Sequence, residues 1–103
     1  MMGVYSITNI TNGKVYIGSS KNLTRRKNQH FSKLRNNKHG NDYLQKSFNK
    51  HKEKSFKFKI IEECSLALLE NKEQYYMDLS KCLEKDKGYN IRPDAKGKTF
   101  SQE

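Results

Sequence analysis

The residues of this chain best suited to chemistry are two tyrosines, an arginine and a histidine within the first thirty positions. Tyr5 ends a Gly-Val-Tyr string, Tyr16 lies in a Val-Tyr-Ile-Gly string, and Arg26 and His30 follow. Cleavage of a phosphodiester needs an activated water, neutralisation of charge on the phosphoryl oxygens and help for the departing oxygen. Phenol, guanidinium and imidazole groups suit these tasks if the fold brings them together.

The two tyrosines are predicted to lie on neighbouring strands of a hairpin. Residues 3–9 and 14–19 are rich in β-branched and aromatic types, and the Asn-Gly pair between them tolerates the positive φ of a tight turn. A register with Tyr16 opposite Asn9 and one with Tyr16 opposite Tyr5 both place the phenols on the same face. Taken alone, such a pair is also typical of a hairpin that is merely stabilised by its tyrosines.

Arg26 and His30 are predicted to lie on a helix over residues 23–36. They are four positions apart and share the edge of an apolar stripe that begins at Leu23. A cationic side chain at such an edge either extends across the core to solvent or is presented into a cleft. For each residue considered alone, the pattern favours the first arrangement.

The middle of the chain is predicted to contain a second helix and a third strand. The helix covers residues 42–51, with Asn41 as its N-cap. The strand covers residues 55–61, where Phe56, Phe58 and Ile60 alternate with lysines. Such alternation indicates a strand with one buried face.

The last predicted helix, over residues 66–83 with Ser65 as its N-cap, carries an acidic residue in an apolar setting. Its apolar face consists of Leu66, Leu68, Leu69, Tyr75, Tyr76 and Leu79. Glu73 falls inside this arc, where a carboxylate is costly unless cations or hydrogen bonds compensate it. Lys72 falls inside the arc as well, so periodicity supports a functional acid and a structural ion pair equally.

The charge distribution indicates a polyanionic partner. The formal net charge is +10, and the first 41 residues contain eight Lys/Arg and no Asp/Glu. No broad face of Trp, Phe and Leu accompanies these cations, so nucleic acid is favoured over a membrane surface. Four of the cations are expected to support substrate binding: Lys14, Lys21, Arg25 and Lys27.

Length and composition predict one compact domain with a thin core, because the 103 residues are only 33% hydrophobic. No apolar run is long enough to span a bilayer and no secretory signal is evident, so a cytoplasmic location is expected. Cys64 and Cys82 lack the spacing of a zinc site or of a disulfide framework. We expect both cysteines to be free thiols that pack as small buried apolar residues in a reducing environment.

Six pieces of the chain, in order, resemble the motifs of the GIY-YIG nuclease family. They are Gly3-Val4-Tyr5, Val15-Tyr16-Ile17-Gly18-Ser19-Ser20, Asn22-Leu23, Arg26 with His30, Glu73, and Gly88-Tyr89-Asn90-Ile91. Each piece alone is a weak signal, whereas their order and spacing across residues 3–92 is specific. Residues 47–51, Ser-Phe-Asn-Lys-His, resemble the catalytic domains of phage intron-encoded homing endonucleases of group I introns. The sequence departs from the family pattern in two respects. The first motif contains a valine, and the given sequence ends where such endonucleases continue into a linker and a DNA-recognition domain.

The resemblance implies an α/β (α+β) domain with a three-stranded antiparallel sheet flanked by helices. This agrees with the order β-β-α-α-β-α that the residue pattern predicts. Residues 1–92 are expected to form the catalytic domain and residues 93–103 a polar, flexible tail.

The resemblance also implies metal-dependent hydrolysis of a DNA phosphodiester bond. In this comparison Glu73 holds one Mg²⁺ or Mn²⁺ per active site, and Arg26 binds the scissile phosphate. One tyrosine acts as the general base, with a slight preference for Tyr5 as the base and for Tyr16 as the residue that orients water. The choice between the two phenols stays open from the sequence.

Three further residues have supporting roles by the same resemblance. His30 is expected to hydrogen-bond a tyrosine or to relay its proton. His39 is expected to touch the phosphate or the sugar, and Asn90 to brace the metal-binding carboxylate or the tyrosines. No small-molecule cofactor and no membrane partner are expected.

Two other classes of function compete with a nuclease. A basic DNA- or RNA-binding module without activity explains the charge asymmetry, but it gives no reason for Glu73 among apolar neighbours. A protein-interaction domain on an inactive nuclease scaffold is disfavoured, because no matched catalytic position is replaced. The target sequence, nicking as against double-strand cleavage, and a monomer as against a transient dimer on DNA stay open.

Overall fold

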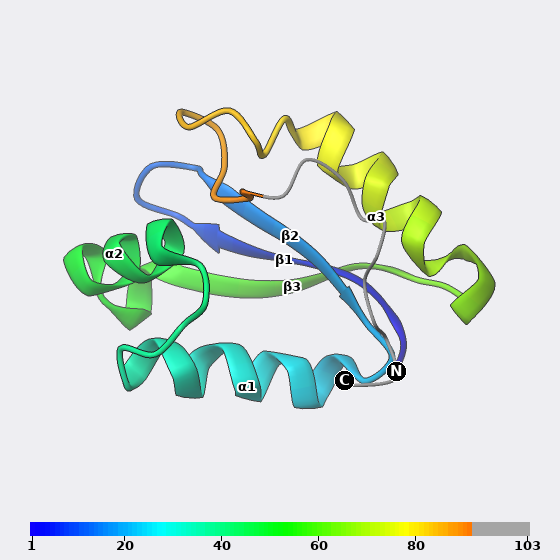
Figure 1. Cartoon of the computed structure of the whole chain (residues 1–103), viewed down its shortest axis with the longest axis horizontal. Coiled ribbons are helices and arrows are strands. Elements are labelled where there is room, and N and C mark those ends of the chain that lie inside the picture. Colours follow the sequence, from blue (N-terminus) through cyan, green and yellow to red (C-terminus); the bar gives the residue numbers. More distant parts are fainter. Residues whose placement is uncertain (92–103) are drawn as a thin grey trace.

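Helices pack on both faces of a three-stranded antiparallel sheet in the computed structural model of this chain, which describes residues 1–91 (Figure 1). The strand order in the sheet is β2-β1-β3. In chain order the elements are β1 (Gly3–Asn9), β2 (Val15–Ser20), α1 (Leu23–Arg35), α2 (Asp42–His51), the short 3₁₀ helix η1 (Glu53–Ser55), β3 (Phe56–Glu63) and α3 (Leu66–Ser80). The predicted order β-β-α-α-β-α and the antiparallel sheet are confirmed.

β1 is the central strand, and nearly all of its residues are buried because it pairs on both sides. The hairpin to β2 turns at Gly13, whose φ of +77° needs the freedom of glycine. Tyr5 pairs with Gly18 and Ile7 with Tyr16, so neither predicted register is correct. Both differ from the observed one by an even number of residues, and the two phenols therefore share a face as predicted.

The two faces of the sheet support two separate apolar clusters. On one face Tyr5 and Ile7 pack with residues of α1 and α2, and on the other Val4 and Ile17 pack with Met77 of α3. Figure 1 shows this division, with α1 and α2 on one side of the strands and α3 on the other. The thin core expected from composition is thus divided between two layers.

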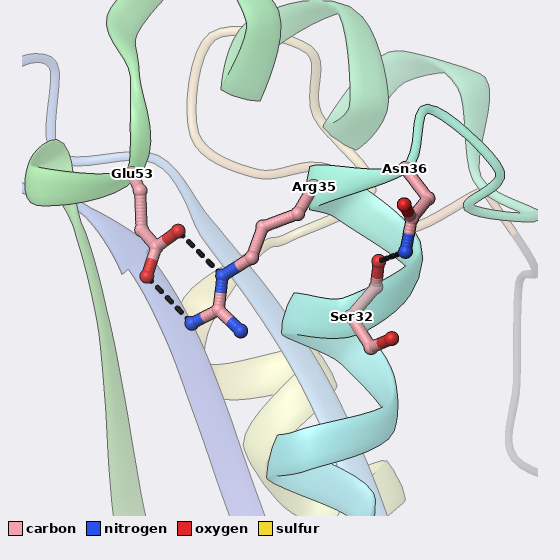
Figure 2. A network of polar contacts seen from close by, with 4 residues as sticks. All are labelled: Ser32, Arg35, Asn36 and Glu53. Carbon is pink, nitrogen blue, oxygen red and sulfur yellow. Dashed lines mark hydrogen bonds and ion pairs between the residues drawn. The ribbon is translucent and has the colours of Figure 1, made fainter.

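The two ends of α1 are held by side-chain contacts. Asn22 caps its beginning by accepting a hydrogen bond from the backbone of Arg25 at 3.1 Å. At its end Arg35 forms two hydrogen bonds of 2.7 Å with Glu53 of η1, close to the Asn36 amide that donates to the Ser32 carbonyl (Figure 2). The ion pair is about half exposed, and exposed pairs contribute little to stability, so it orients the chain more than it stabilises it.

The buried face of α3 differs from the predicted one. It is a narrow line of residues four apart, Leu69, Glu73 and Met77, and the helix ends at Ser80 rather than at residue 83. Most of the predicted apolar arc is more than 45% exposed: Leu66, Leu68, Tyr75 and Leu79. Among the described residues α3 touches the sheet along one line, and no second layer covers the rest of the arc.

The segment after α3 returns to the free edge of β2. Gly88 forms a parallel bridge with Val15, and the amide of Tyr89 donates to the Val15 carbonyl at 2.8 Å. The Tyr89 ring is fully buried, and its hydroxyl contacts Asn9 at 3.0 Å and Ser47 at 2.6 Å. This polar cluster joins the hairpin, α2 and the last segment.

The prediction of two buried, unpaired cysteines is confirmed only in part. Cys82 is buried and Cys64 half-buried, and both are free thiols. Within residues 1–91, none of the helices has the length and apolar character needed to cross a membrane. The predicted flexible tail at residues 93–103 lies outside the described residues.

Gly18→Ala is expected to destabilise the domain by about 1–3 kcal/mol, the usual cost of overpacking. A Cβ at this position would lie 2.5 Å from Cζ of Tyr5 and still closer to its hydroxyl, so the ring must move. Urea unfolding measures the effect. Gly40→Ala is the matched control, because nothing lies within 4 Å of the position of its Cβ. Equal stability of the two variants would contradict the packing of Tyr5 on Gly18.

Candidate active site

A cavity of about 360 Å³ opens at the edge of β2 and is reached from both faces of the sheet. Its polar lining comes from β2, α1, the loop before α2, α3 and the last segment: Tyr16, Arg26, His30, Lys33, His39, Asn41, Glu73 and Asn90. Four of the five predicted catalytic side chains therefore converge on one cavity. Tyr5 is the exception, since it lies one layer deeper.

Tyr5 is buried behind the cavity and contacts it through histidine. Its side chain is 1% exposed, and its hydroxyl lies 2.5 Å from Nε2 of His30. Nδ1 of His30 lies 2.7 Å from Nε2 of His39, so the three side chains form a continuous chain of hydrogen bonds. Sequence reasoning predicted a bond between His30 and a tyrosine, but it did not connect His39 to this chain.

The electrostatic environment of Tyr5 opposes its ionisation in the absence of ligands. Burial, followed by the nearby Tyr16 hydroxyl, raises the pKa of Tyr5 well above its ordinary value of 10.0. Arg26 acts in the opposite direction, because its charge and its hydrogen bond lower the pKa of Tyr5. The phenol therefore needs positive charge nearby to become a base.

Tyr16 is half-buried and lies on the wall of the cavity. Its ring meets the ring of His30 edge to face, with centroids 5.4 Å apart, and the ring of His39 at 6.4 Å. Tyr16 is thus the phenol of the pair that faces the cavity, as expected for a residue that orients water or phosphate.

Glu73 reaches the cavity from α3, on the opposite face of the sheet from the tyrosines. It is 2% exposed and accepts a short hydrogen bond from the hydroxyl of Ser19 on β2. Lys72, the competing residue in the predicted arc, pairs instead with Glu62 of β3 at 3.1 Å. An ion pair of Glu73 with its neighbour Lys72 is therefore not the reason for the buried carboxylate.

His39 is held in a position that disfavours its charged form. Burial, with Arg26 and Lys33 close by, lowers the pKa of His39 from 6.5 to about 4. Its Nδ1 accepts a hydrogen bond of 3.0 Å from the backbone amide of Asn41. At neutral pH the ring is uncharged and fixed in orientation.

The Asn90 side chain binds the backbone of β2, and no described hydrogen bond joins it to Glu73. Its side-chain oxygen accepts from the amide of Ile17 at 2.8 Å, and its side-chain nitrogen donates to the Ile17 carbonyl at 2.9 Å. These bonds fix the backbone between Tyr16 and Gly18 at the free edge of β2. Among the hydrogen bonds described for Asn90, none goes to Glu73 or to a tyrosine hydroxyl, which differs from the bracing that we expected.

The four predicted substrate-binding cations do not line the cavity. Lys14 donates to the Tyr43 hydroxyl at 2.6 Å, and Lys27 lies over the Phe58 ring at 6.0 Å, while Lys21 and Arg25 are exposed near the start of α1. The lysine that does line the cavity is Lys33.

Lys33 and Ser19 are among the residues of the site that the sequence did not predict. Lys33 follows Arg26 by seven positions and His30 by three, so the helical period already placed it on their face. Ser19, the partner of Glu73, gave no such signal, because its role depends on where α3 crosses β2.

Comparison with known proteins identifies the family. The protein-family model of the GIY-YIG catalytic domain matches residues 1–90 of the sequence. This chain belongs to the GIY-YIG family. The matched region includes every residue described above, and the site lies where the two tyrosine motifs meet the first and last helices of this GIY-YIG domain.

Individual relatives agree with this placement. The chain is 37% identical over 101 residues to intron-associated endonuclease 1 of Enterobacteria phage T4, covering 96% of this chain and 40% of that protein's length. The catalytic domain of the homing endonuclease I-TevI superposes with a TM-score of 0.80 at 35% identity, over 89% of this chain and 99% of that domain. A glutamate-to-alanine mutant of the catalytic domain of intron endonuclease I-TevI superposes with a TM-score of 0.81 at 34% identity. The match covers 96% of this chain and 97% of that domain. The chain is thus a GIY-YIG nuclease domain similar to the catalytic domain of a homing endonuclease.

The depressed pKa of His39 predicts a pH-dependent loss of stability. Between pH 6.5 and about 4 the unfolded chain binds a proton at this position that the folded chain does not, so stability falls as the pH decreases through this window. His39→Gln removes this contribution, on the order of 2 kcal/mol after solvent screening is allowed for. Urea unfolding at pH 7.5 and pH 4.5 measures it.

The carboxylates titrate in both proteins, so the difference between the two pH profiles isolates His39. The variant is expected to lose less stability on acidification than the unmodified chain. Parallel profiles would contradict a neutral, buried His39.

Proposed function

We propose that this chain is the catalytic domain of a DNA endonuclease that hydrolyses a phosphodiester bond with the help of one divalent metal ion. The observation that carries the proposal is the buried carboxylate of Glu73 in the same cavity as Arg26 and His30. A carboxylate is costly to bury unless hydrogen bonds or cations compensate it, and here it shares a cavity with the groups that could bind a phosphate and its metal ion. Membership in the GIY-YIG family supports the same reading.

The donor groups of the cavity fit one hard cation. Glu73 is the sole carboxylate on its described lining, and residues 1–91 contain no group of three or more His, Cys, Asp and Glu that could hold a metal. This excludes a site built of several protein ligands but suits Mg²⁺ or Mn²⁺, which keep water and phosphate oxygens as their remaining ligands. When bound, such an ion neutralises phosphoryl oxygens and lowers the pKa of a coordinated water.

Ser19 has a role beside Glu73. Its hydroxyl donates to the carboxylate and so helps to fix the orientation in which Glu73 would hold a metal ion. Because Ser19 is fully buried on β2, the carboxylate is held by the sheet as well as by its own helix.

Arg26 is the residue best suited to bind the scissile phosphate. It lines the same cavity as Glu73, and a planar guanidinium can offer two parallel donors to two phosphoryl oxygens. As negative charge develops on those oxygens the contact strengthens, so its effect falls on the transition state.

Tyr5 is the proposed general base, and Tyr16 the residue that orients water on the cavity wall. The Tyr5 hydroxyl has two groups that stabilise its phenolate, Nε2 of His30 at 2.5 Å and the guanidinium of Arg26. Gly18 leaves no side chain over this hydroxyl at the edge of β2. Since burial raises the pKa of Tyr5, activity is expected to increase with pH above neutrality.

DNA is the proposed substrate because the chain carries a net charge of +10. Lys21 and Arg25, which are exposed near the start of α1, would contact phosphates of the DNA backbone outside the cavity. Phosphate contacts bind without reading sequence, so the target would be selected by other means. One active site cuts one strand, and a double-strand break would require two copies or two successive nicks.

Glu73→Gln is expected to reduce Mg²⁺-dependent nicking of supercoiled plasmid by at least about 100-fold, because it removes the carboxylate charge while keeping the shape. The control is Glu70→Gln, which changes the same residue type on the same helix away from the cavity and is expected to keep full activity.

Plasmid relaxation with and without Mg²⁺ measures both variants, and circular dichroism confirms their fold. Equal activity of the two variants would contradict the role of Glu73. Salt-sensitive DNA binding by the unmodified chain without any nicking would instead favour the non-catalytic binding module.

A further inference from the structure

The chain of hydrogen bonds from Tyr5 through His30 and His39 ends at the backbone amide of Asn41, which can act only as a donor. This amide lies 3.0 Å from Nδ1 of His39, and a backbone N–H can only donate. Nδ1 of His39 is therefore an acceptor and carries no proton. In a neutral imidazole with an unprotonated Nδ1, the proton lies on Nε2.

The second histidine, His30, is constrained in the same way. The protonated Nε2 of His39 lies 2.7 Å from Nδ1 of His30, so Nδ1 of His30 must accept. The proton of a neutral His30 is then on Nε2, which lies 2.5 Å from the Tyr5 hydroxyl. The Asn41 amide thus determines the proton position on His39, and His39 determines the proton position on His30. The Tyr5 oxygen accepts the last hydrogen bond.

Charged forms of either ring do not fit this chain. A protonated His30 would direct its Nδ1–H against the Nε2–H of His39 across 2.7 Å. A protonated His39 would lose the bond from Asn41 and place a third cation beside Arg26 and Lys33. Burial and these two cations lower the pKa of His39 to about 4, which agrees with a neutral ring.

The orientation of His39 is itself built into the fold. Its backbone amide donates to Oε1 of the buried Gln45 on α2 at 3.0 Å, and Nε2 of Gln45 donates to the Leu34 carbonyl at 3.0 Å. The rings of His30 and His39 are nearly parallel, at 16°, with centroids 5.0 Å apart. The loop before α2 is thereby fastened to both helices.

We propose that His39, oriented by the Asn41 amide, is a positioning residue that locks His30 in the tautomer that donates its Nε2–H to Tyr5. The proposal rests on the proposed function in one respect, the role of Tyr5 as general base. It gives His30 a definite task, because a ring that donates to Tyr5 cannot take the phenolic proton. The Tyr5 hydroxyl therefore loses its proton to solvent as the pH rises, His30 stabilises the resulting phenolate, and the phenolate oxygen accepts the proton of the attacking water.

The groups that share the surroundings of the two histidines come from every neighbouring element. They are Tyr5 from β1, Tyr16 from β2, Arg26 and Lys33 from α1, and Glu73 from α3. A pH profile of activity combines all of these groups, so the first test observes the two rings directly.

The test is a long-range ¹H–¹⁵N correlation spectrum of the whole chain labelled with ¹⁵N-histidine, recorded at neutral pH without DNA or metal. We expect both His30 and His39 to show a protonated Nε2 and an unprotonated Nδ1. A protonated Nδ1 on either ring at neutral pH would overturn the proposal. This measurement needs no variant and no activity.

Two variants then separate the lock from a merely structural role. His39→Phe removes the donor, so we expect His30 to lose its fixed tautomer, nicking near pH 7 to fall by about tenfold or more, and the rising limb of the pH–rate profile to move to higher pH. His39→Gln supplies an amide donor and is expected to recover most of the activity and the His30 tautomer. A His39→Phe variant with an unchanged His30 tautomer would contradict the lock.

The outcomes distinguish this proposal from the proposed function. The expected tautomers in a chain that does not nick DNA would support the lock and contradict the nuclease. Active nicking with a protonated Nδ1 on His30 would support the nuclease and contradict the lock.

Discussion

The packing of the Tyr5 ring on Gly18 is the contact on which the site depends. Because residue 18 has no side chain, the central strand can send a phenol across to the free edge of β2. At that edge the two faces of the sheet meet, so Arg26 from one face and Glu73 from the other can share a cavity. Asn90 then satisfies the backbone of Ile17, which keeps the edge ordered without closing it.

The histidines and Arg26 set the electrostatic environment of the Tyr5 hydroxyl. Burial raises the pKa of Tyr5 and Arg26 acts in the opposite direction, while Nε2 of His30 lies 2.5 Å from the Tyr5 hydroxyl. The loop before α2 holds the histidines, and the Arg26 guanidinium donates a hydrogen bond to the Gln29 side chain at 3.2 Å. The cost of burying polar groups in a thin core is thus offset by bonds that also prepare the site for a negatively charged ligand.

Local signals determined how much could be predicted from sequence. Alternation placed Tyr5 and Tyr16 on one face although the exact register was wrong, because even shifts keep the face. The buried line of α3 could not be predicted, since Leu66, Leu68 and Leu79 are as apolar as Leu69 and only the crossing of the helix over β2 selects Leu69. The partner of Asn90 was missed for the same reason, as the return of the last segment to β2 has no local signature.

Titration of the unmodified chain with Mn²⁺, followed by the loss of backbone amide NMR signals, tests whether Glu73 holds a metal ion in this cavity. Paramagnetic broadening is expected to be centred on Ser19 and Glu73 and to extend to His30, and Glu73→Gln is expected to abolish it. Broadening centred on the exposed acids near Glu84, or broadening unchanged in Glu73→Gln, would contradict a metal-binding carboxylate in this cavity.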